Sequence, residues 1–192
     1  MKMKHLFTLL LLCFSGILLQ AQSFRESDSY TIKKTLTDKP FEYGPYVFQL
    51  YEVEDRTIAL ARFAVTEPEL LESVRISTLE DVQLEGVAEA IRVEVEYLSC
   101  CSQVQVHYFL RTDDHKLITL PRLTNVYCED TSQDLRYTFP GEPYGEEGLI
   151  IKGIHTYNET QEIIDVVPQL SIAWNDDRFE HTGIAYGFND EE

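Results

Sequence analysis

The chain has 192 residues and a formal net charge of −17, and 44% of its residues are hydrophobic. This length suits one domain, and an apolar fraction that includes eleven tyrosines and ten phenylalanines excludes a wholly disordered chain. So acidic a surface repels phosphate backbones and anionic lipid headgroups, which argues against nucleic acid or a membrane surface as partner.

The N-terminus, residues 1–21, has the layout of a secretory signal peptide. Lys2 and Lys4 precede an apolar run at 6–19, and the small residue Ala21 marks the expected cleavage site. The run is shorter than the ~20 apolar residues of a transmembrane helix. Cys13 lies inside the run, with no Gly or Ala before it, which argues against lipoprotein anchoring. We predict a secreted or periplasmic mature chain without a membrane span. Cleavage removes two lysines and no acid, so its net charge becomes −19.

The first part of the mature chain reads as a leader followed by strands. Residues 22–29 are polar without a pattern and are predicted to be a flexible leader. A first strand is expected at 30–36. The segment 41–53 is rich in aromatics and valine, and it alternates from Tyr46 onward, after a turn signal at 43–46. A polar turn separates it from the residues 57–64, which predicts a hairpin.

One short helix is predicted at 67–74. Thr66 can cap it, Glu69 can complete a capping box, and Pro68 is tolerated in a first turn. Three apolar residues give this helix a hydrophobic side: Leu70, Leu71 and Val74. We expect about two turns, because the pattern beyond them does not separate helix from strand.

The strongest strand signal lies at 91–110, around a pair of adjacent cysteines. In 91–97 the apolar residues are odd-numbered, and Arg92, Glu94 and Glu96 fall on the opposite face, which is expected to be solvated. In 104–110 the apolar residues are even-numbered. A bulge or a hairpin explains this change of parity, and a single strand of that length would be unusually long. We therefore predict a turn at 99–102.

The rest of the chain continues as short strands. Pro121 interrupts a strand at 116–128, the segment 140–148 is a loop, and Pro168 ends a hairpin. The expected strands are 116–120, 123–128, 135–139, 149–157, 162–167, 170–174 and 178–185, and 189–192 is an acidic tail. Short strands at this spacing predict one mostly β domain over 30–188. Its fold is an antiparallel β-sandwich, with a β-barrel as second choice.

Three cysteines remain after cleavage, so one is left unpaired. Export allows a disulfide. Adjacent cysteines on a strand point to opposite faces, and Cys101 continues the apolar face of 91–97. We therefore prefer a Cys101–Cys128 bond, with Cys100 as the alternative partner of Cys128. A bond between Cys100 and Cys101 would close a strained ring.

No catalytic, cofactor-binding or metal-ligating residue is assigned. The histidines lack close ligand spacing, and the nucleophile, phosphate-loop and dinucleotide motifs are absent. Acidic pairs are numerous, so their presence does not identify an active site.

A set of aromatic residues forms a candidate ligand platform. Aromatic faces beside carboxylates suit sugar or peptide recognition, although strands are also rich in aromatics for packing reasons. The residues are Tyr43, Tyr46, Tyr51, Tyr144 and Trp174. From these features we expect a non-catalytic binding or interaction domain whose partner is a protein or a glycan. The alternative is a hydrolase of extracellular polymer that uses a carboxylate pair as acid and base.

Overall fold

The computed structural model describes residues 23–36, 46–65, 67–128, 132–175 and 178–181. Within these ranges the chain forms thirteen strands and no helix. The predicted signal peptide and acidic tail lie outside them. The strands are β1 Arg25–Glu26, β2 Tyr30–Leu36, β3 Tyr46–Glu52, β4 Ala61–Ala64, β5 Leu71–Glu80, β6 Val87–Leu98, β7 Ser102–Thr112, β8 Leu117–Thr119, β9 Leu123–Tyr127, β10 Gln133–Thr138, β11 Leu149–Tyr157, β12 Ile163–Asn175 and β13 Arg178–His181.

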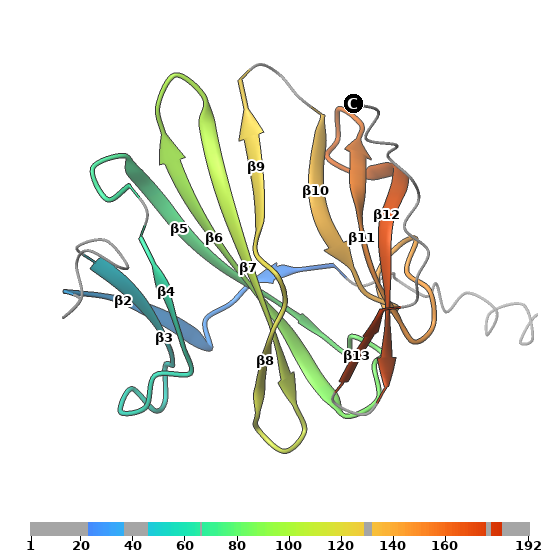
Figure 1. Ribbon diagram of the computed structural model, residues 1–192, viewed down its shortest axis with the longest axis horizontal. Helices are drawn as coiled ribbons and strands as arrows, with labels where there is room; N and C mark the ends of the chain where they lie inside the picture. The colour runs from blue at the N-terminus through green and yellow to red at the C-terminus, as the bar shows by residue number, and fades with distance from the viewer. Residues whose placement is uncertain (1–22, 37–45, 66, 129–131, 176–177, 182–192) are drawn as a thin grey trace, which may run out of the picture.

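These strands form three antiparallel sheets (Figure 1). The central sheet has the order β1-β5-β6-β7-β8, and β9 also pairs with β7. A second sheet has the order β10-β11-β12-β13, and a small sheet has the order β2-β3-β4. Within the described residues each sheet keeps open edges and none closes into a barrel. The fold agrees with the predicted sandwich and not with the second choice.

The central sheet is covered on both faces, so the sandwich has three layers. On one face Ile91, Val93 and Val95 pack in a core with Phe48 and Leu50 of the small sheet. The opposite face packs against the second sheet in a larger core. Its members include Val104, Val106, Tyr108 and Leu110 of β7 and Tyr137, Ile150 and Trp174 of the second sheet. Alternation along each strand supplies the two faces, because successive side chains point to opposite sides.

The turn at the cysteine pair is confirmed. β6 ends at Leu98 and β7 begins at Ser102, and the two strands pair from Leu98–Ser102 to Val87–Thr112, with a register shift between Val87 and Glu89. The predicted interruption at Pro121 is also confirmed, because β8 and β9 lie on either side of it and both pair with β7. β8 and β9 therefore form one edge of the central sheet, which is interrupted at Pro121.

The predicted helix at 67–74 is wrong. Leu70 donates to the Glu67 carbonyl at 3.0 Å in a single turn, and β5 starts at Leu71. Thr66 lies outside the described residues. β5 pairs with β6 over nearly its whole length, with a register shift between Leu71 and Ser73. A two-turn helix is marginal without tertiary contacts, and the long pairing with β6 overrides the local capping signal.

β12 differs from the prediction because it continues through Pro168. The proline pairs with Gly153 of β11, where the register shifts. A Cβ atom at Gly153 would lie 2.8 Å from the Val167 carbonyl oxygen. The irregular register accommodates a residue that cannot donate to the ladder, and glycine allows the two backbones to approach.

The segment predicted as a leader contributes to the core. β1 pairs with β5 through Arg25–Thr78 and Glu26–Ser77. The Phe24 ring lies 6.0 Å from the Tyr108 ring, between centroids, in an edge-to-face contact. Aromatic packing therefore fixes the start of the described chain between the central and second sheets.

Candidate functional site

A polar cleft of about 370 Å³ lies where the central sheet meets the second sheet. Its walls come from β6, β9, β10 and the end of β11. The lining residues are Arg92, Glu94, Tyr127, Ser132, Gln133, Asp134, Arg136, Tyr157 and Gln161. A larger hollow of about 480 Å³ lies along β1, but most of its lining side chains are exposed. The inter-sheet cleft is the better candidate because most of its polar lining side chains are half-buried and Arg136 is buried.

Asn125 of β9 joins the two sheets beside this cleft. Its side-chain nitrogen donates to the Leu135 carbonyl at 3.1 Å, and its side-chain oxygen accepts from the Leu135 N–H at 2.8 Å. The buried amide therefore replaces a strand partner for the edge of β10. These two bonds hold Asp134 and Arg136, the neighbours of Leu135, against the central sheet.

The charged face of β6 supplies one wall. Arg92 and Glu94, which were expected to face solvent, have side chains only 19% and 23% exposed. Arg92 donates from Nε to the Ser77 hydroxyl at 3.1 Å, and its Nη2 lies 3.8 Å from a Glu94 carboxylate oxygen. The Arg92 guanidinium also lies 4.8 Å from the Phe24 ring centroid, a cation–π contact.

Arg136 and Glu142 form a buried ion pair behind the opposite wall. Arg136 Nη2 donates to Glu142 Oε1, and the Phe139 N–H donates to Glu142 Oε2 at 3.1 Å. Burial opposes the charge on Arg136, but Glu142 and the oxygens of Tyr108 and Tyr157 raise its pKa. Burial raises the pKa of Glu142 above its ordinary value, against the opposing effect of Arg136. The guanidinium is thus a fixed cation in the wall of the cleft.

Asp134 and Tyr157 connect this pair to the cleft. The Tyr157 hydroxyl donates to Asp134 Oδ1 at 2.9 Å and accepts from Arg136 Nη1 at 3.4 Å. Burial raises the pKa of Asp134, although Arg136 and the Tyr157 hydroxyl lower it. Burial also raises the pKa of Tyr157 to about 12. A carboxyl group, a phenol and a guanidinium therefore face one space in a desolvated environment.

This arrangement offers both donors and acceptors to a ligand. The lining side chains include guanidinium, amide and hydroxyl donors and carboxylate acceptors. Arg136 Nε lies buried behind this surface without a hydrogen-bond partner, which is unusual for a buried donor. Tyr127, whose pKa is raised by burial, adds an aromatic surface. Positive and negative groups are balanced across the cleft, so the chemistry suits a polar ligand rich in hydroxyl or amide groups rather than a simple ion.

The candidate aromatic platform is not assembled on one surface. Tyr43 lies outside the described residues. Tyr46 and Tyr51 belong to β3, and their positions differ by an odd number, so they point to opposite faces. Tyr51 is only 8% exposed.

The other two platform residues belong to the second-sheet side of the molecule. Trp174 is 9% exposed and donates from Nε1 to the Glu85 carbonyl at 2.7 Å. Tyr144, in the loop before β11, is 51% exposed. Ligand binding by Tyr144 stays a prediction.

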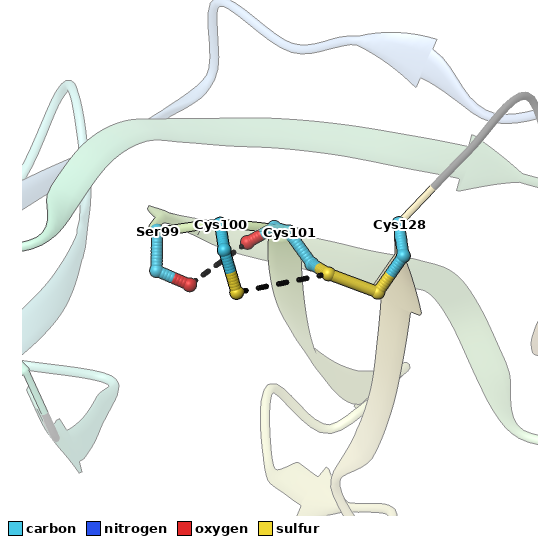
Figure 2. The surroundings of a disulfide bond; sticks show 4 residues. All are labelled: Ser99, Cys100, Cys101 and Cys128. Atoms are coloured by element: carbon cyan, nitrogen blue, oxygen red, sulfur yellow. Dashed lines mark hydrogen bonds between the residues drawn. A yellow bond between two sulfur atoms is a disulfide. The ribbon is translucent and has the colours of Figure 1, made fainter.

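The structure contains the preferred Cys101–Cys128 disulfide, and Cys100 is a free, exposed cysteine (Figure 2). The bond links the turn after β6 to the residue after β9. Cys101 is half-buried in this turn and does not continue the core face of β6 as expected, because the chain has already left the strand.

Sequence reasoning missed most of the cleft. Its one usable signal was the charged face of β6, where Arg92 and Glu94 alternate with core residues. The partners Asp134, Arg136 and Tyr157 come from strands far away in sequence, and no local motif marks them.

The described chain contains no group of three or more side chains suited to hold a metal ion. The same residues also contain no helix that is long and apolar enough to cross a bilayer. In comparison with known proteins, no family model, no curated protein and no solved structure matches this chain.

Proposed function

We propose that this chain is a secreted or periplasmic binding domain without catalysis, and that its ligand occupies the inter-sheet cleft. The observation that carries the proposal is the desolvated group of Asp134, Tyr157 and Arg136 in the wall of a cleft large enough for a small ligand. The Cys101–Cys128 bond is compatible with an oxidising compartment, as the signal-peptide layout predicts.

A glycan is the ligand class that we favour. Sugar hydroxyl groups both donate and accept hydrogen bonds, and the cleft presents carboxylate acceptors, guanidinium donors and tyrosine hydroxyl groups together. Tyr127 and Tyr157 add aromatic surface for the apolar face of a sugar ring. A peptide segment would meet the same polar groups and is the other ligand that the proposal allows.

The test is a titration of the mature protein with soluble oligosaccharides and short peptides, in which calorimetry or ligand-observed NMR measures binding. Tyr157→Phe removes the hydroxyl that contacts Asp134 and Arg136. The matched control is Thr57→Val, which removes an exposed hydroxyl that donates to Asp55 and does not line the cleft. We expect Tyr157→Phe to weaken binding about tenfold, the equivalent of one hydrogen bond of about 1.4 kcal/mol. Equal affinities for Tyr157→Phe and the wild type would refute the assignment of the cleft.

A hydrolase is the second candidate, because Asp134 and Glu94 line the same cleft and burial raises the pKa of Asp134. Two carboxyl groups in one cleft, one of them with a raised pKa, are what a general acid and a general base require. In that case the wild type would degrade the oligosaccharide that it binds, and both Asp134→Asn and Glu94→Gln would abolish turnover. A bound oligosaccharide that remains intact after long incubation favours the binding domain.

A further inference from the structure

The three cysteines of the mature chain lie together at one place on the surface. The free Cys100 Sγ lies 4.0 Å from Cys101 Sγ, which is bonded to Cys128. Figure 2 shows the three side chains at one turn, with the Cys100 and Cys128 sulfur atoms both beside Cys101 Sγ. Cys100 and Cys128 are exposed and Cys101 is half-buried, so solvent and external reagents reach the group.

This placement brings a free thiol into contact with a disulfide, the two groups that react in thiol–disulfide exchange. In that reaction a thiolate attacks one sulfur of a disulfide, and the other sulfur leaves as a thiolate. Cys100 Sγ, 4.0 Å from Cys101 Sγ, is the sulfur within reach to attack, Cys101 is the sulfur attacked, and Cys128 is the leaving group.

We propose that Cys100, Cys101 and Cys128 form a thiol–disulfide exchange site in which Cys128 becomes a reactive thiol. The Cys100 thiolate attacks Cys101 Sγ, a Cys100–Cys101 bond forms, the Cys101–Cys128 bond breaks, and Cys128 leaves as a thiolate. The step consumes no external oxidant or reductant, because one disulfide replaces another and the negative charge moves from Cys100 to Cys128. This site is separate from the cleft and does not depend on the proposed ligand.

The resting state remains the Cys101–Cys128 bond. Consecutive Cα atoms are ~3.8 Å apart, below the usual range for disulfides, so the Cys100–Cys101 bond is strained. The exchanged form is therefore a minor state that returns to the resting bond unless Cys128 reacts. Outside the cell the reagent class that traps it is another disulfide, which Cys128 attacks to form a mixed disulfide with release of a thiolate.

The local structure helps to keep the three sulfur atoms near one another. The Ser99 hydroxyl donates to the Cys101 carbonyl at 3.1 Å, and the Ser99 N–H donates to the same oxygen at 3.3 Å. These bonds close the turn between β6 and β7. The pairing of Ser102 with Tyr127 brings the end of β9 beside that turn, which positions Cys128 next to Cys101.

The test traps the leaving thiol on the intact mature protein. The protein is incubated at mildly alkaline pH with acrylamide, a slow thiol reagent, at several low concentrations, then quenched with acid and digested with pepsin. Mass spectrometry identifies the labelled cysteine. We expect some molecules to carry acrylamide on Cys128 together with an internal Cys100–Cys101 bond, and this label to appear faster as pH rises because thiolate is the nucleophile.

Cys100→Ser is the control, because it keeps the Cys101–Cys128 bond and removes the attacking thiol at an exposed position. We expect the label on Cys128 to be lost in this variant. Label on Cys100 alone at every reagent concentration would overturn the proposal, and so would equal labelling of Cys128 in Cys100→Ser.

Discussion

Removal of the Cys101–Cys128 bond is expected to lower the free energy of unfolding by about 3.5 kcal/mol. The bond joins residues 27 apart in sequence. In the chain-entropy treatment a cross-link restricts the unfolded chain, and for a loop of this size the relation gives about 12 cal/mol/K, or about 3.5 kcal/mol at 25 °C. The closed loop contains β7, β8 and β9, so the constraint acts on one edge of the central sheet.

The perturbation is the double substitution Cys101→Ser and Cys128→Ser in a Cys100→Ser background, so that no thiol can form a replacement bond. Guanidinium unfolding measures the free energy and its dependence on denaturant. Cys100→Ser alone is the matched control and should change stability by less than about 0.5 kcal/mol, because Cys100 is exposed. A loss below about 1 kcal/mol in the triple variant, relative to this control, would refute the entropic reasoning.

Three further predictions concern buried polar and backbone features. Burial lowers the pKa of His107 and of His155 to about 4, whereas the pKa of an unfolded histidine is about 6.5. The unfolded chain binds more protons between these values, so stability should fall as pH drops through that window, by up to about 1.4 kcal/mol per pH unit for each histidine. His107→Phe keeps a ring against Phe63 and should reduce the dependence of the free energy of unfolding on pH, measured by unfolding curves recorded across the window. An unchanged pH dependence would contradict a lowered pKa at His107. Gly153→Ala should cost about 1–3 kcal/mol in thermal or denaturant unfolding, because its Cβ would meet the Val167 carbonyl oxygen; wild-type stability would show that the strands relax freely. Asn125→Ala should cost about 1–3 kcal/mol and increase hydrogen exchange at the Leu135 amide, since both polar groups of Leu135 lose their partner; unchanged exchange there would count against this role.

Disulfide exchange at Cys100 and ligand binding in the cleft can be tested separately. Cys100→Ser leaves every residue of the cleft unchanged, and Tyr157→Phe leaves the three cysteines unchanged. Failure of the labelling experiment would leave the proposed binding function intact, and failure of the oligosaccharide titration would leave the exchange site intact. Tyr127 lines the cleft and precedes Cys128, so the triple cysteine variant also shows whether the bond affects ligand affinity.

Much of the secondary structure follows from local alternation. The hairpins at β3–β4 and β6–β7, the interruption at Pro121 and the sandwich class were all predicted from apolar periodicity and turn residues. These features depend on residues close in sequence, because a strand exposes its side chains alternately and a turn needs particular residues. The change of parity at the cysteine pair was sufficient to place the turn that joins β6 and β7.

The helix prediction failed because a local signal competed with a distant partner. Capping at Thr66 and Glu69 favours a helix in isolation, and Leu71 to Glu80 instead pairs with β6. Similarly, the leader at 22–29 has no periodic pattern, yet Phe24 packs between two sheets against Tyr108. In both cases the stabilising contacts come from residues far away in sequence.

The cleft likewise combines features that local sequence predicts with features that only distant contacts decide. Alternation marks Arg92 and Glu94 as one polar face of β6, and polarity predicts a solvated surface. The second sheet covers this face and brings Asp134, Arg136 and Tyr157 opposite it. Local periodicity therefore establishes which side chains share a face, but the packing of layers establishes whether that face meets water or forms a site. That outcome depends on non-local pairing and burial, which no short stretch of sequence contains.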